Sequence, residues 1–131
     1  MTVRAEEKDD PDRVYAVRNS EDFAAQAEAI YERLEEQAGE DVAGAWLTGL
    51  QAVKATLATL PGRLPVAEEN RYFQKVHPGP PLHVVLHRHG RSIWRLLLTV
   101  HEATAEDAAY VMLHQFRHGA QKPLKKWPPQ S

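Results

Sequence analysis

The residues of this chain whose types could do chemistry are mainly histidines and arginines. All seven histidines lie between positions 77 and 118. His83, His87 and His89 differ in position by even numbers, so their side chains would point to one face of a strand. Arg91 would lie on the same face if the turn after His89 permits it. Zinc needs three or four converging ligands, and no carboxylate lies close enough in sequence to complete a set. The cluster therefore indicates solvated strand histidines, or contacts to a polyanion or a protein partner.

Further basic residues lie on strand-like segments. Arg95 interrupts an otherwise apolar run. Because a buried guanidinium needs a paired acid, Arg95 is expected on an open sheet face or in a groove, or else in a structural ion pair with a helix or tail carboxylate. Arg117, His118 and Lys122 come together at the end of a later apolar run. A solvated strand end explains this second group as well as a binding site does.

Several kinds of chemistry are excluded by what the chain does not contain. It has no cysteine, which excludes disulfides, cysteine-zinc sites and thiol nucleophiles. It has no GxxxxGK[ST], GxGxxG, GxSxG or HExxH motif. No cofactor and no metal are therefore expected, and nucleotide binding of the P-loop or Rossmann type and serine hydrolysis are set aside.

The charges of the chain are unevenly distributed. Residues 1–70 hold 7 Lys/Arg and 15 Asp/Glu, and residues 71–131 hold 9 and 3, so the net charge of -2 hides an acidic and a basic part. Such asymmetry indicates a surface that faces a polyanion, although two ordinary surfaces of opposite sign also fit. Since no apolar run approaches the roughly 20 residues of a membrane span and the N-terminus is too polar for a signal peptide, we expect a cytoplasmic protein.

The elements that would position these residues follow from periodicity. A β-prone run predicts a strand at 14–17. Apolar residues at helical spacing then predict one helix that begins after Ser20 and ends at Gly39. The same pattern predicts a second helix, capped by Asp41 and ended by Pro61. Because about two residues join these helices, we expect an antiparallel hairpin.

The second half of the chain changes to a period of two. A proline-rich connection at 61–81 cannot be a central strand, but a β-prone run at 71–76 interrupts it and predicts a short strand. Three strands are predicted after it, at 82–88, 92–101 and 109–117.

These elements predict an α+β fold in two layers, with an N-terminal strand, an antiparallel helix hairpin and an antiparallel three-stranded meander. The other sheet face is expected to stay open, with Arg95, Arg117 and several histidines on it. Residues 1–12 are predicted to form a flexible arm, 13–124 a single domain and 125–131 a tail.

Four segments carry a resemblance to a known family. Residues 45–61, AWLTGLQAVKATLATLP, resemble the "W…L…AI..L…P" segment of the RelE/ParE toxin superfamily, the toxins of bacterial type II toxin–antitoxin (plasmid stabilisation) modules. Residues 63–70, RLPVAEEN, resemble its "P.APEN" loop, and residues 94–100, WRLLLTV, its "YR.LY.V" strand. Residues 111–124, VMLHQFRHGAQKPL, resemble its closing "V.VL.VRHG.R.P" segment. The resemblance covers about residues 14–124 and favours the ParE-like branch.

The resemblance implies the β-α-α-β-β-β layout of that family. It also implies a toxin that inhibits a nucleic-acid-handling target such as DNA gyrase and is neutralised by a cognate antitoxin over the basic sheet side. The resemblance also allows the toxin to form an oligomer through its complex with the antitoxin. The residues expected to contact the target or the antitoxin are His87, His89, Arg91, Arg95, Arg117 and Lys122.

Two other readings stay open. RelE-like members cut mRNA in the ribosome by activating a ribose 2′-hydroxyl against the adjacent phosphate, which cationic groups stabilise. The resemblance would then make Arg95, Arg117 and His118 catalytic. Those nucleases commonly carry a tyrosine after the basic cluster, whereas residues 119–131 contain none. The third reading is a diverged, non-toxic interaction module of the same fold.

Overall fold

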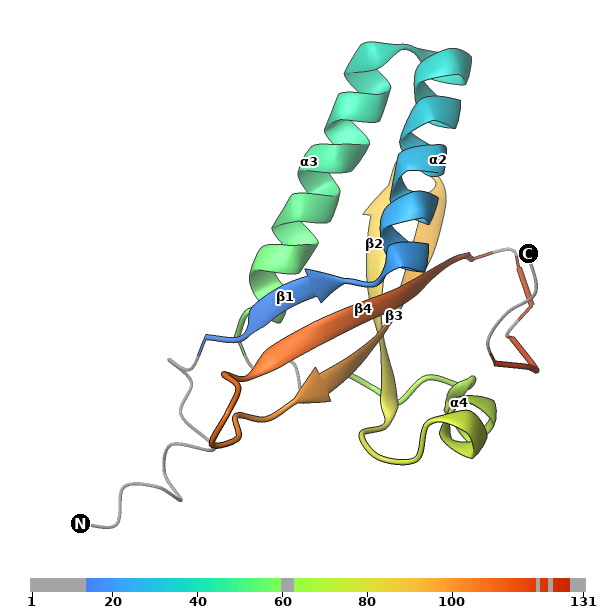
Figure 1. Ribbon diagram of the computed structural model, residues 1–131. Coiled ribbons are helices and arrows are strands. Elements are labelled where there is room, and N and C mark those ends of the chain that lie inside the picture. Colours follow the sequence, from blue (N-terminus) through green and yellow to red (C-terminus); the bar gives the residue numbers. More distant parts are fainter. Residues whose placement is uncertain (1–13, 60–62, 120, 123, 128–131) are drawn as a thin grey trace.

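The computed structural model of the chain describes residues 14–59, 63–119, 121–122 and 124–127 (Figure 1). Within them the fold is α+β, with a four-stranded mixed sheet and three helices. The predicted arm at 1–12 and part of the predicted tail at 125–131 lie outside the described residues. The elements are β1 Ala16–Asn19, α2 Glu21–Ala38, α3 Glu40–Leu57, α4 Asn70–Val76, β2 Leu82–His89, β3 Ser92–His101 and β4 Tyr110–His118.

The sheet has the strand order β1-β4-β3-β2. The three predicted strands of the second half form β2, β3 and β4, and their antiparallel meander is confirmed. Gly90 has a φ of 58° in the turn between β2 and β3, a conformation that glycine adopts without strain. The first strand adds to the far edge of the meander, where it runs parallel to β4 with Val17 opposite Val111.

The helix hairpin forms as its caps predict. Ser20 accepts a hydrogen bond from the Phe23 amide at 3.0 Å, which satisfies one free donor of the first turn of α2. Gly39, with a φ of 93°, ends α2 and is also the N-cap of α3. The predicted Asp41 cap is therefore wrong, because one residue with positive φ reverses the chain and α3 already begins at Glu40.

The main core lies between this hairpin and one face of the sheet. Phe23 of α2 stacks on Phe116 of β4 with ring centroids 4.1 Å apart, and Trp46 of α3 lies 5.9 Å from the same ring. Leu96 and Leu98 of β3 complete the contact and are fully buried. The amphipathic helices thus bury their apolar stripes on the sheet, as the α+β prediction requires.

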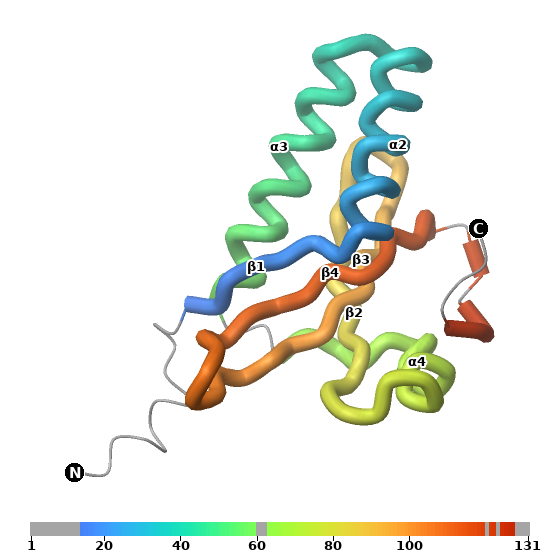
Figure 2. Tube along the Cα trace, viewed as in Figure 1, coloured from blue at the N-terminus to red at the C-terminus, as the bar shows by residue number. Residues whose placement is uncertain are grey.

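A third helix lies away from the hairpin, beside β2 (Figure 2). The predicted short strand at 71–76 is wrong, because these residues form α4. Buried Phe73 holds this seven-residue helix by packing in a second core with Leu97 and Trp127. Asn70 accepts a hydrogen bond from the Leu82 amide at 2.8 Å, which fixes the start of α4 to the start of β2. The second sheet face is therefore partly covered and not fully open.

The two glycines inside α3 should respond in opposite directions to alanine. Nothing lies within 4 Å of a Cβ built at Gly44, whereas a Cβ at Gly49 would lie 2.7 Å from Cε1 of buried His87. We expect Gly44→Ala to stabilise the protein by up to about 1 kcal/mol through helix propensity. Gly49→Ala should destabilise it by about 1–3 kcal/mol through overpacking. Urea unfolding of both variants tests this, and equal shifts of the midpoint would contradict it.

Candidate basic binding site

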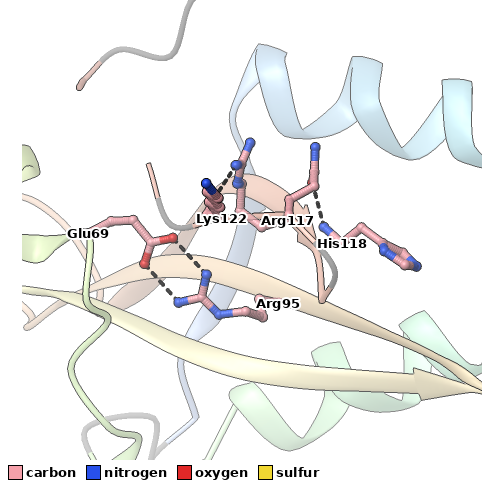
Figure 3. Close-up of polar contacts among 6 residues, drawn as sticks. Glu69, Arg95, Arg117, His118 and Lys122 are labelled. Carbon is pink, nitrogen blue, oxygen red and sulfur yellow. Dashed lines mark hydrogen bonds and ion pairs between the residues drawn. The ribbon is translucent and has the colours of Figure 1, made fainter. Parts of the chain in front are cut away.

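A bidentate ion pair lies on the sheet face opposite the hairpin (Figure 3). Arg95 projects from β3, and its two terminal nitrogens donate to the two carboxylate oxygens of Glu69 at 2.7 and 2.8 Å. The Glu69 side chain is fully buried just before α4, and the Arg95 side chain is 18% exposed. The sequence left open a structural ion pair between Arg95 and a helix or tail carboxylate; the ion pair is present, but its acid lies in the loop before α4.

The two residues of the pair stabilise each other's charged forms. Burial alone would raise the pKa of Glu69, but the hydrogen bonds and the charge of Arg95 outweigh it and hold the pKa below its ordinary value. In turn, the hydrogen bonds from Arg95 to Glu69 raise the pKa of Arg95. Both groups stay charged at neutral pH, and each neutralises the other.

Arg117 supplies a positive charge without an acid partner of its own. It lies directly opposite Arg95 on β4, so both side chains share one face. One terminal nitrogen donates to the Lys122 carbonyl at 2.5 Å, and the buried Nε has no hydrogen-bond partner within the part of the chain that the structure describes. Burial lowers the pKa of Arg117; the charge of Glu69 opposes this effect and the charge of Arg95 adds to it. Together with exposed Lys122, Arg95 and Arg117 make three cations, which face the single carboxylate of Glu69. We call Arg95, Glu69, Arg117 and Lys122 the basic cluster.

His118 does not join the basic cluster. Successive residues of a strand point to opposite faces, and the His118 ring lies against Trp94 with centroids 4.8 Å apart. Trp94 in turn packs edge-on against Trp46 on the hairpin side. The three residues that a RelE-like nuclease would use are therefore divided, with Arg95 and Arg117 on one face and His118 on the other.

The expectation that several histidines stand on the open sheet face is wrong for His83 and His87. Both are buried toward the hairpin, at 8% and 2% exposure. There His83 Nδ1 pairs with the Leu64 carbonyl at 2.8 Å and His87 Nε2 with the Trp46 carbonyl at 3.1 Å. Burial lowers the pKa of His87, so it is a neutral core residue with almost no surface for a partner. Of the other expected contact residues, His89 ends β2. Arg91 lies in the turn between β2 and β3, four residues before Arg95 in the sequence.

Sequence reasoning missed two parts of this face. Glu69 was visible only as one acid of the AEEN segment, and nothing local marks it as the partner of Arg95. A register shift at Leu97/Leu98 leaves His114 as the extra residue of β4, where its Nε2 lies 2.8 Å from the Thr99 hydroxyl. The same hydroxyl lies 2.7 Å from Nε2 of His101. No periodicity rule predicts a bulge at this position.

The basic cluster has the chemistry of an anion-binding surface. Arg117 and Lys122 can pair with carboxylates or phosphates, while Arg95 is already engaged. Within the described ranges, no group of three or more His, Asp or Glu side chains could hold a metal ion. No helix among those residues combines the length and the apolar character needed to cross a bilayer.

Comparisons of the chain with protein-family models, with curated proteins and with solved structures found no match.

Proposed function

We propose that this chain is the toxin component of a type II toxin–antitoxin module, of the ParE-like kind. In this proposal it acts in the cytoplasm, inhibits a nucleic-acid-handling target such as DNA gyrase, and is neutralised by a cognate antitoxin. The support comes from the four family-like segments and from an α+β arrangement that puts a helix hairpin on one face of a sheet and the basic cluster on the other.

One observation favours a binding protein over a nuclease. Both terminal nitrogens of Arg95 donate to fully buried Glu69, so this guanidinium is already neutralised and would compete with its own ion pair in binding a phosphate. Arg117 then remains beside this ion pair as a partly exposed guanidinium, and His118 lies on the other side. A cation whose neighbouring acid, Glu69, is already paired with Arg95 suits recognition of an anionic surface better than proton transfer.

The proposal implies that the surplus cations of the basic cluster contact the target or the antitoxin. We expect Arg117→Gln and Lys122→Gln each to weaken inhibition of gyrase supercoiling by roughly tenfold, the size of a contact worth about 1.4 kcal/mol. The matched control is Lys125→Gln, which removes the same charge from an exposed lysine three residues farther along. Titration of purified protein into a supercoiling assay gives the inhibitory concentrations.

Induced expression in a bacterial host tests the wider proposal. The expected result is growth arrest with induction of the DNA-damage response, relieved when the neighbouring gene is expressed as well. Arrest accompanied by cleavage of translated transcripts would assign the RelE-like activity instead. Equal growth with and without the neighbouring gene would remove the toxin proposal and leave the non-toxic interaction module.

A further inference from the structure

A separate pocket of about 340 Å³ lies on the same sheet face, farther along β3 from Arg95. Its volume falls in the range of small-molecule sites. One wall comes from α4 and the loop after it, and the floor comes from β3 and β4. The lining residues are Phe73, Val76, His77, Pro78, Pro80, Thr99, His101 and His114.

The wall of this pocket is held in place before any ligand arrives. The Gln74 side-chain amide donates to the Gly79 carbonyl at 2.9 Å and ties the loop back to α4. The His77 amide donates to the Phe73 carbonyl at 2.8 Å. Three prolines, Pro78, Pro80 and Pro81, restrict the backbone of the same loop. Val76 is 48% exposed, so it stands at the mouth. A preformed wall lowers the entropy lost on binding.

The floor carries a hydrogen-bonded row of three side chains. The Thr99 hydroxyl has one hydrogen to donate, yet it pairs with Nε2 of both His101 and His114. One ring must therefore accept at Nε2 and carry its proton on Nδ1, while the other donates from Nε2 and has a bare Nδ1. The row thus offers one Nδ1 donor and one Nδ1 acceptor. Neither Nδ1 has a hydrogen-bond partner among the described residues. Neither is among the buried unpaired atoms of those residues, so each Nδ1 retains some exposed surface.

The rings of this row are uncharged at neutral pH. Burial lowers the pKa of His114 to about 4, with a further contribution from His101 and His77. Burial also lowers the pKa of His101, helped by Arg18. Arg18 lies over one face of Tyr110, and the His101 ring stacks on Tyr110 at 4.4 Å. The floor of the pocket is therefore aromatic and polar without a formal charge, which disfavours ionic ligands there.

We propose that this pocket binds a flat, uncharged heteroaromatic ring that presents a hydrogen-bond donor beside an acceptor, the chemistry of a nucleobase. The ring packs with its face against the apolar wall, and the two imidazoles form hydrogen bonds with the donor and the acceptor on its edge. An indole offers only a donor and a phenyl ring offers neither, so a tryptophan or phenylalanine side chain of a protein partner matches the floor less well. The inference is independent of the proposed function.

NMR titration of the isotope-labelled full chain at pH 7.5 tests the inference with adenosine, cytidine and N-acetyltryptophanamide. We expect a nucleoside to shift the signals of His101 and His114 saturably and to bind at least about tenfold more tightly than the tryptophan derivative. A short single-stranded oligonucleotide of the same bases distinguishes the source of the ring. Tighter binding than the nucleoside indicates a polymer ligand, and equal binding a free one.

Two variants locate the binding. His101→Phe keeps the stack on Tyr110 but removes the ring nitrogens, and Val76→Lys obstructs the mouth from an exposed position. Both should weaken nucleoside binding by about tenfold or more. Val66→Lys, at a residue that is 54% exposed and does not line the pocket, is the matched control and should bind normally. Binding that Val76→Lys leaves unchanged would overturn the proposal, as would preferred binding of the tryptophan derivative or no saturation by any nucleoside.

Discussion

Replacing Arg95 with alanine is expected to lower the free energy of unfolding by about 3–5 kcal/mol, because it leaves a buried carboxylate without its partner. In the wild type Glu69 has no exposed surface, and the two hydrogen bonds that Arg95 donates replace those that the carboxylate makes to water in the unfolded chain. Glu69→Gln should cost less, about 1–2 kcal/mol, since the Arg95 side chain is 18% exposed and can reach solvent. Urea denaturation monitored by tryptophan fluorescence measures both changes.

The double variant Arg95→Met with Glu69→Met is the control for this prediction. Removing both charges leaves no unpaired ion, so most of the stability should return, to within about 1–2 kcal/mol of the wild type. A loss below 1 kcal/mol in Arg95→Ala alone would show that the pair is not a buried structural bridge. Arg95→Ala alone is accordingly a poor test of catalysis, because loss of fold and loss of chemistry would look the same. Toxicity that persists in the stable double variant would exclude a catalytic role for Arg95.

Acidification is expected to destabilise the protein by roughly 2 kcal/mol between pH 6.5 and 4.5, chiefly through His114. The pKa of His114 is about 4 in the folded protein, against an ordinary value of 6.5. Between these values the unfolded chain binds a proton that the folded chain excludes, so the free energy of unfolding falls as pH falls through this window. His87 and His101 also have lowered pKa values and act in the same direction.

His114→Phe should flatten this pH dependence. A phenyl ring keeps the contacts of His114 with Phe73 and Trp127 but cannot be protonated. Urea midpoints at several pH values measure the slope for both proteins. The scan ends at pH 4.5 so that protonation of Glu69 does not add to the effect. The pKa of Glu69 lies below its ordinary value of 4.5 in the folded protein, so its contribution to the free energy of unfolding is lost only as pH falls through that lower pKa. Equal slopes in the wild type and the variant would contradict the assignment to His114.

Local signals were enough to predict most of the elements. Ser20 and Gly39 bound α2 as their side-chain and backbone chemistry requires, and the period of two placed β2, β3 and β4 within a residue or two of the structure. The helix α4 could not be predicted in this way, because seven residues are too few for a helical period to show. Its stability comes from Phe73 packing against residues remote in the sequence. Tertiary contacts thus override the β-prone composition of this segment.

The candidate site was predictable in composition but not in orientation. The even spacing of His83 and His87 correctly puts them on one strand face, yet spacing cannot say which face meets the hairpin. Their polarity suggested solvent, whereas carbonyl partners let both enter the core, and the missing side chain of Gly49 makes room for His87. Arg95 was recognised as needing an acid, but that acid lies 26 residues earlier in a loop. Such long-range pairs depend on the assembled fold.

The parallel pairing of β1 with β4 has a consequence for how the protein folds. The α2–α3 hairpin can form from local contacts, but β1 has no neighbour until the last strand arrives. The hydrogen bond from Ser20 to the His114 carbonyl, which joins the start of α2 to the bulge in β4, spans 94 residues. Closing so long a loop is entropically costly and delays folding until the rest of the sheet is ready. The basic cluster likewise needs Arg117 of β4 and Lys122, so a nascent chain in which β4 has not yet been made could not engage the proposed target.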